Sequence, residues 1–185
     1  RARADEVGAR ARWNVYGTPA MLTSTGTPLA EGLPADPVAA AQAYVSTNRE
    51  LLGLTERAAK ALEVISVAPM GEGAAVLFRQ RFGNLEAGRD GMLVVGVRDG
   101  DVWHVSSSLA RDASQPAGAT LSANEAARIA TADAGVDAAA VQGVELVAVP
   151  VPQSAARAAY QVVLMGGDEV GPVAVTTFVD ARDGS

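Results

Sequence analysis

Hydrophobic positions recur at helical spacing in the stretch that follows residue 36. The apolar members of this stripe are Val38, Ala41, Val45 and Leu52. Asp36-Pro37 stands directly before it, and Asp is a good N-cap acceptor while Pro suits the first helical position. The pattern predicts an amphipathic helix over about residues 37–52. A shorter helix is expected to begin near Thr55.

A second helical stretch reads "LSANEAARIATADAG" and begins at Leu121. Ser122 and Glu125 have the spacing of a capping box. The apolar positions that follow are Ala126, Ile129, Ala130 and Ala134. Gly135 ends the stretch, as glycine often does at a helix C-terminus. The pattern predicts a second capped helix.

Strand-like runs follow each helical stretch. Four come after the first helix, at residues 62–70, 74–82, 91–97 and 101–109. Three come after the second, at residues 144–151, 159–165 and 173–181. The "GEG" between the first two runs and Asp99-Gly100 between the next two are typical of hairpin turns. Consecutive hairpin-linked strands predict antiparallel sheets.

This order of elements predicts an α+β protein made of two consecutive units, each a helix packed on an antiparallel sheet. The first unit, residues 36–109, would hold a helix plus four strands. The second, residues 120–185, would hold a helix plus three strands. Residues 1–35 are rich in Gly, Pro and Thr and are expected to form an extended N-terminal lead-in, with residues 110–119 as a linker.

Composition narrows the function classes. Apolar residues make up 49% of the chain but aromatic residues only 4%, so the core must be built largely from Val, Leu and Ala. The net charge is −6, and no basic cluster follows the first dozen residues, which argues against a nucleic-acid surface. No apolar run approaches the roughly 20 residues of a membrane span. The absence of cysteine excludes a disulfide framework, a thiolate zinc site and a cysteine nucleophile.

The only histidine, His104, lies in "RDGDVWHVSSS", which also holds the aspartates and serines of which triads are made. If Asp99-Gly100 is a two-residue turn, Gly96 faces Trp103 and Val95 faces His104. His104 and Ser106 then share one face of the strand, and Asp101 points to the other face with Trp103. No nucleophile elbow is present. A structural hairpin is favoured over a catalytic triad.

No metal or cofactor site is expected in this chain. One histidine and no cysteine leave only carboxylates as ligands, and "DARDGS" is too short and too poor in ligands for a calcium loop. The glycine-containing stretches lack the GxxxxGK[ST] spacing of a phosphate-binding loop.

Gln80 is the polar residue that fits its position least well. It falls between Phe78 and Phe82 on the face of its strand that is expected to be buried. A buried amide that finds no hydrogen-bond partner costs about 1–3 kcal/mol. Gln80 therefore pairs with the backbone of a neighbouring loop, or it meets a partner protein. The first alternative is favoured because most buried side-chain polar atoms are satisfied internally.

Two stretches of the chain resemble known families. "AAAQAYVSTNRELLGL" followed by "VLFRQRFGNLEAGRDGMLVVGVRDGDVWHVSSSL" resembles the fungalysin/thermolysin propeptide (FTP) domain over about residues 36–109. The most specific element is Gln80 followed by Phe82-Gly83. Residues 120–184 are similar to a PepSY domain, whose typical D-A-x-x-G ending would be "DARDG" here. Together they resemble the propeptide of a secreted fungalysin-type zinc metalloprotease.

The resemblance implies a non-enzymatic role in a zymogen. Such propeptides act as intramolecular chaperones and inhibitors of the metalloprotease catalytic domain downstream, which is the expected partner. The zinc would belong to that domain, since a chain with one histidine cannot contain HExxH. The expected location is secreted or extracellular, with a signal peptide already removed. The oligomeric state stays open.

Candidate contact residues follow from the misplaced glutamine and from the end of the chain. Gln80, Phe82 and the Gly83–Asp90 loop, including Asn84, are candidates for contact with the protease. The last residues, Asp183, Gly184 and Ser185, are candidates for the run-in to the cleavage site.

Two other classes of function stay open. One is a free-standing secreted PepSY-type inhibitor or binding module that acts on proteases in trans. The other is a serine hydrolase built on His104.

Overall fold

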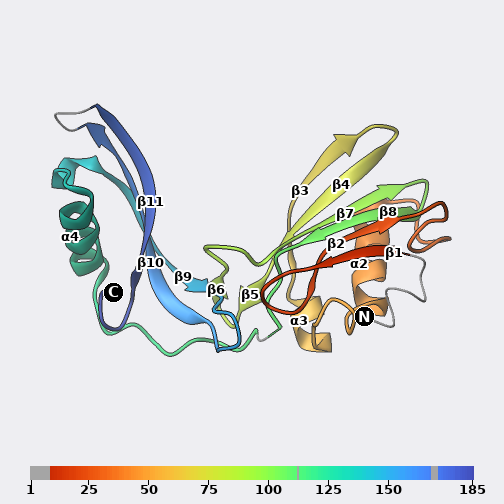
Figure 1. Ribbon diagram of the computed structural model, residues 1–185, viewed down its shortest axis with the longest axis horizontal. Helices are drawn as coiled ribbons and strands as arrows, with labels where there is room; N and C mark the ends of the chain where they lie inside the picture. The colour runs from red at the N-terminus through yellow and green to blue at the C-terminus, as the bar shows by residue number, and fades with distance from the viewer. Residues whose placement is uncertain (1–8, 112, 168–170) are drawn as a thin grey trace.

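The chain folds into two units, each a sheet with its helices on one side (Figure 1). The computed structural model describes residues 9–111, 113–167 and 171–185. Residues 9–111 form the first unit and the later residues form the second. None of the described helices is long and apolar enough to cross a membrane. The predicted α+β class with antiparallel sheets is confirmed.

The first unit is a six-stranded antiparallel sheet in the order β1-β2-β8-β7-β4-β3. Its strands are β1 (Ala9–Trp13), β2 (Pro19–Ser24), β3 (Glu63–Met70), β4 (Gly73–Arg79), β7 (Met92–Arg98) and β8 (Asp101–Ser107). Two helices accompany it, α2 (Pro37–Thr47) and α3 (Glu56–Lys60). Helix α2 packs against β4, β7 and β8, and the core lies between them.

The expected N-terminal lead-in is wrong for residues 9–24, because these residues form β1 and β2. Strand β2 pairs with β8, and Leu22 lies opposite Val105 with both side chains fully buried. Ala11 lies opposite Leu22 on β1 and packs against the same core. The Gly- and Thr-rich composition concealed a short alternation of buried and half-buried positions.

Helix α2 begins as predicted, since Asp36 Oδ1 accepts a hydrogen bond from the N–H of Ala39 at 2.8 Å. It ends at Thr47, five residues before the predicted limit at residue 52. Asn48 stops it: both its backbone N–H and its side-chain amide donate to the carbonyl of Tyr44. The apolar residues that extended the predicted helix pack into the core from the following turn. The short helix expected near Thr55 is α3.

The second unit holds α4 (Ala123–Ala134), a 3-10 turn η1 (Ala138–Ala140), β9 (Val141–Val149), β10 (Arg157–Gly167) and β11 (Pro172–Asp180). Its sheet is antiparallel in the order β11-β10-β9. The capping box of Ser122 and Glu125 is confirmed, and Gly135 ends α4 in the left-handed conformation with φ of 66°. Figure 1 shows α4 on the side of the sheet turned away from the first unit.

A small hairpin, β5 (Arg81–Phe82) and β6 (Leu85–Glu86), joins the two units. The chain beyond it meets β9, where Ala87 bridges Ala148 and the N–H of Gly88 donates to the Ala148 carbonyl at 3.0 Å. A Cβ on Gly88 would lie 2.4 Å from Cγ2 of Val147, so only glycine allows this approach. The hairpin fixes the first unit against the sheet of the second.

Candidate functional site

The β7–β8 hairpin turns at Asp99-Gly100, as predicted. Both residues have positive φ, 54° and 79°, as a type I′ turn requires. The next pairing is also the predicted one, but the register then shifts, and Gly96 lies opposite His104. The predicted pairing of Gly96 with Trp103 is wrong because Trp103 occupies a β-bulge.

The bulge changes which side chains share a face. Val102 and Val105 are both fully buried in the core, so Trp103 and His104 lie on the opposite face. Asp101 precedes Val102 and lies on that same face. The prediction that Asp101 and His104 point to opposite faces is therefore wrong, since it assumed strict alternation.

A shared face does not produce a triad. Asp101 Oδ1 accepts a hydrogen bond from the N–H of Gly32 at 3.2 Å. The hydroxyl groups of Ser107 and Ser108 accept backbone N–H groups at 3.1 and 3.0 Å. Within the described residues no hydrogen bond joins His104 to a serine or a carboxylate, and no side-chain cluster could hold a metal ion. The arrangement offers no nucleophile activated by a base.

Gln80 is fully buried and fully hydrogen-bonded. Its Nε2 donates to the Ala110 carbonyl at 2.8 Å, and its Oε1 accepts the Ala110 N–H at 3.0 Å. Its backbone N–H donates to Gly91 and its carbonyl accepts from Ala87. The pairing with a loop backbone is confirmed, and the predicted contact of the Gln80 side chain with a protease is wrong in this fold. Gln80 instead holds the beginning of the predicted linker to the first sheet.

Phe82 is also fully buried, so its predicted protease contact is wrong for the same reason. It lies in a small cluster between the units with Ala87, Ala110, Ala148 and Ala156. The rest of the predicted contact loop is divided. Gly83 and Asn84 are exposed at the hairpin tip, whereas Gly88 packs against the second unit. For Gly83 and Asn84, contact with a partner stays a prediction.

Ion pairs hold the β5–β6 hairpin in place. Arg79 pairs with Glu86, and Arg81 pairs with Glu86 at 3.1 Å and with Glu63 at 3.0 Å. The hydrogen bond from Arg79 holds the pKa of the Glu86 carboxyl below its usual range. Every carboxylate of this group faces a guanidinium, so the group supports a structure rather than proton transfer.

The last residues form a turn that folds back on β11. The N–H of Asp180 donates to the Ser185 carbonyl at 2.9 Å, and the Ser185 N–H donates to Oδ1 of Asp183 at 3.0 Å. The Ser185 N–H lowers the pKa of the Asp183 carboxyl. Gly184 has φ of 81°, which gives a physical reason for a glycine here. A role of Asp183, Gly184 and Ser185 beside a cleavage site stays a prediction.

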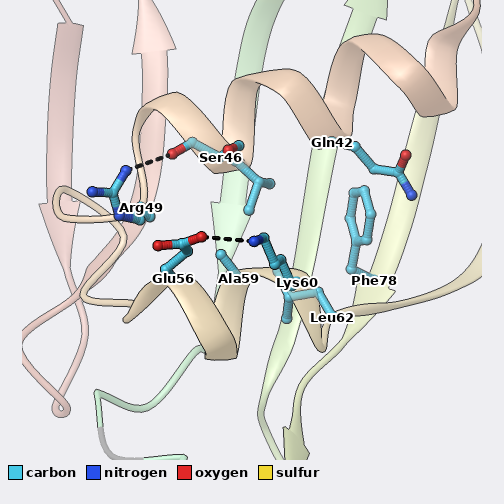
Figure 2. Close-up of a pocket in the computed structure, with 9 residues that line it drawn as sticks. Gln42, Ser46, Arg49, Glu56, Ala59, Lys60, Leu62 and Phe78 are labelled. Carbon is cyan, nitrogen blue, oxygen red and sulfur yellow. Dashed lines mark hydrogen bonds and ion pairs between the residues drawn. The ribbon is translucent and has the colours of Figure 1, made fainter.

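A pocket that the sequence did not indicate lies between α2 and α3 (Figure 2). Its cavity volume is about 260 Å³. Lys60 Nζ donates to Glu56 Oε1 at 2.6 Å, and Arg49 donates to the backbone carbonyl of Ser46 at 3.3 Å (Figure 2). Glu56 and Lys60 are exposed and pair with each other, Arg49 is half-buried, and the residues that line the pocket include no nucleophile paired with a base.

The face of the six-stranded sheet opposite α2, named here the helix-free face, is crossed by two rows of side chains. The first row is Arg10, Thr23, His104, Gly96, Ala75 and Ala68. The second row is Arg12, Met21, Ser106, Val94, Leu77 and Ser66. The pairing of six strands brings these positions together. The four predicted strands at residues 62–70, 74–82, 91–97 and 101–109 supplied eight of the twelve, and the positions on β1 and β2 were not predicted.

The three-stranded sheet also has a face without a helix. Gln161, Val163 and Met165 of β10 point away from α4, and Met165 is 56% exposed. Phe178 of β11 lies opposite Gln161 and is half-buried. Each unit therefore presents apolar side chains on the sheet face that its helix leaves uncovered.

Comparison with known proteins identifies no family for this chain. No family model matches the chain, and no curated protein has a matching sequence. A solved structure, the Bacillus megaterium YpeB C-terminal domain, is similar over 91% of this chain and 69% of its own. The two are 12% identical in sequence and the TM-score is 0.41. A likeness at this level assigns neither a family nor a function.

Proposed function

We propose that this chain is a non-catalytic propeptide. It helps a downstream zinc metalloprotease domain to fold, and it inhibits that domain until the propeptide is removed. Sequence resemblance to FTP and PepSY domains supports this function, with the two units in the order that the resemblance implies. The observation that carries the proposal is that both sheets have a helix-free face bearing apolar side chains. Exposed apolar surface on a folded domain commonly marks a binding site.

In this role the chain binds and shields, and it breaks no bond. Covalent linkage to the protease gives a high effective concentration, so a modest contact surface suffices for inhibition. The zinc ion and the general base would belong to the protease domain. The second unit, held to the first by Gly88 and Ala148, extends the surface available for contact.

An experiment in trans tests the proposal. The purified chain is added to a fungalysin-type catalytic domain in two states, denatured and diluted for refolding, or folded and active. We expect a higher yield of refolded activity and inhibition of the folded enzyme. A protein of similar size and net charge serves as the control. If neither the yield nor the activity changes, the proposal is wrong.

A free-standing inhibitor or binding module uses the same helix-free faces, so it is retained as the second candidate. The coding sequence after Ser185 separates the two candidates. A downstream HExxH region supports a propeptide, and a stop codon supports a module that acts in trans.

A further inference from the structure

We infer that the helix-free face of the six-stranded sheet is the surface that meets the partner domain, and that it fits a protein surface carrying carboxylates beside an apolar patch. The inference rests on the proposed function, since the partner is the metalloprotease catalytic domain. The contact residues that it names are accessible to a partner, whereas the candidates from the sequence, Gln80 and Phe82, are buried.

The charge of this face differs from that of the whole chain. The chain has a net charge of −6, yet Arg10 and Arg12 stand exposed at the edge of the face on β1. Among the described residues neither forms an ion pair. Asp101, the acidic residue nearby on β8, already accepts from Gly32. Two unpaired guanidinium groups favour a partner with carboxylates at this edge.

The middle of the face is apolar. Gly96, Ala75 and Ala68 follow one another across β7, β4 and β3, and the Met70 side chain lies over Gly96, where an added Cβ would come 2.6 Å from the Met70 Cε. The adjacent row places Val94 and Leu77 beside them, both half-buried with no helix above. An apolar centre with a charged edge is the usual composition of a protein–protein interface.

Two unsatisfied donors lie on the same face. Arg79 Nε and Trp103 Nε1 are the buried side-chain nitrogen atoms that lack a hydrogen-bond partner in the part of the chain that the structure describes. Arg79 shares a face with Leu77, and the Trp103 ring lies 4.7 Å beneath the Arg98 guanidinium. Buried donors without acceptors are rare in native proteins. Acceptor groups from a partner, after small side-chain rotations, would satisfy both.

A protein partner fits this face better than a polyanion does. A nucleic acid or an anionic membrane requires a continuous positive surface. Here the arginine pair stands at one edge, and the interior of the face is uncharged at Gly96, Ala75, Val94 and Leu77. Heparin and vesicles of anionic lipid therefore enter the test as competing ligands.

The test measures the dissociation constant of the full chain for a fungalysin-type catalytic domain. The variant Arg10→Glu/Arg12→Glu reverses the charged edge at exposed positions and leaves the core intact. We expect binding to weaken by about tenfold or more, and the difference to shrink as salt is added. The matched control Arg57→Glu/Arg128→Glu makes the same charge change on exposed positions of α3 and α4, and it should alter binding by less than about twofold. Circular dichroism checks that both variants stay folded.

A second variant, Ala75→Arg, places a long charged side chain on the apolar centre, and it should also weaken binding by about tenfold through loss of close contact. If the wild-type chain binds and all three variants bind equally, this inference is wrong and the proposed function stands. If the wild-type chain neither binds nor assists refolding, the proposed function fails and the inference fails with it. If heparin or anionic vesicles bind through Arg10 and Arg12 while the catalytic domain does not bind there, the face is a polyanion site and the inference is overturned.

Discussion

The two units share one plan and differ in the depth of their cores. The buried core of the first unit includes the large side chains of Tyr44, Leu52, Phe78 and Leu93. In the second unit, four of the eight buried core residues are alanines, namely Ala126, Ala130, Ala158 and Ala181. Because hydrophobic stabilisation grows with the apolar area removed from water, one helix on three strands with an alanine-rich core is the weaker structure.

This difference gives the β5–β6 hairpin its importance. The hairpin and the residues after it bring Phe82 and Gly88 against β9, and they add buried contacts that the second unit lacks by itself. The first unit is therefore the scaffold, and the second depends on it. The comparison can be measured directly, since Trp13 and Trp103 both lie in the first unit. Tryptophan fluorescence reports that unit alone, and hydrogen exchange reports both.

The largest expected effect separates the two cores. Phe78→Ala removes a fully buried ring from the first unit and should cost about 3–5 kcal/mol of unfolding free energy. Since the second unit depends on the first, amide exchange should accelerate in both units. Urea unfolding followed by tryptophan fluorescence and exchange followed by mass spectrometry measure the two effects.

The matched variant is Leu164→Ala, which removes a fully buried side chain from the second unit. It should accelerate exchange in α4 and β9–β11 while the tryptophan transition stays nearly in place. An equal shift of the tryptophan transition by both variants would show that the two units unfold as one. The inference that the second unit is the less stable of the two would then be wrong.

The second-largest expected effect comes from a variant that breaks the connection between the two units. Gln80→Ala leaves the buried N–H and carbonyl of Ala110 without partners and should cost about 2–4 kcal/mol. Exchange should accelerate at residues 110–111 and in the second unit. The control is Asn84→Ala, which removes an exposed side chain from the tip of the adjacent β5–β6 hairpin. Comparable destabilisation by the control would contradict the role assigned to Gln80.

Local signals in the sequence predicted most of the regular structure. The caps at Asp36 and Ser122 and the Asp99-Gly100 turn depend on a few adjacent residues, so spacing alone identifies them. The internal pairing of Gln80 also follows from one rule, that a buried amide needs partners. Its partner, Ala110, is 30 residues distant and could not be named from the sequence.

Features that depend on distant strands were missed. Strand β2 is stabilised by pairing with β8, across about 80 residues, and its own stretch reads as loop. The bulge at Trp103 changes the register, and its one local signal is Gly96 on the paired strand, which the sequence pattern predicts only as the partner of Trp103. The two rows on the helix-free face exist only because six strands align, so Arg10 and Arg12 carried no signal as candidates.

The third-largest expected effect is a loss of stability of the first unit at alkaline pH. Burial raises the pKa of the Tyr44 phenol from 10.0 to about 12. The folded state then retains a proton that the unfolded state loses, so this stabilisation is fully present below pH 10 and is lost as the pH rises toward 12. The loss should reach about 2–3 kcal/mol, judged from the pKa difference.

Fluorescence-monitored urea unfolding between pH 9 and about 12 measures the alkaline loss. Tyr44→Phe keeps the ring and should remove the share of the pH dependence that Tyr44 contributes. Tyr16→Phe is the comparison, because Tyr16 also has a pKa of about 12 but lies nearer the surface and donates to Asp90. If Tyr44→Phe leaves the slope unchanged, burial of Tyr44 is not its cause.

The smallest expected effect compares the same kind of change in both units. Ser122 caps α4, where its hydroxyl accepts from the N–H of Glu125 and the Glu125 carboxylate accepts from the Ser122 N–H at 2.8 Å. Asp36 caps α2 through the N–H of Ala39. Ser122→Ala and Asp36→Ala should each cost about 1 kcal/mol. Among the described residues, α4 is the helix that packs on all three strands of the second sheet, β9, β10 and β11, so the same loss should open more of the second unit. Amide exchange rates measure this difference. Ser122→Ala should accelerate exchange through β9–β11, whereas Asp36→Ala should accelerate it in α2 alone. Equal local effects of the two variants would mean that the second unit is as stable as the first.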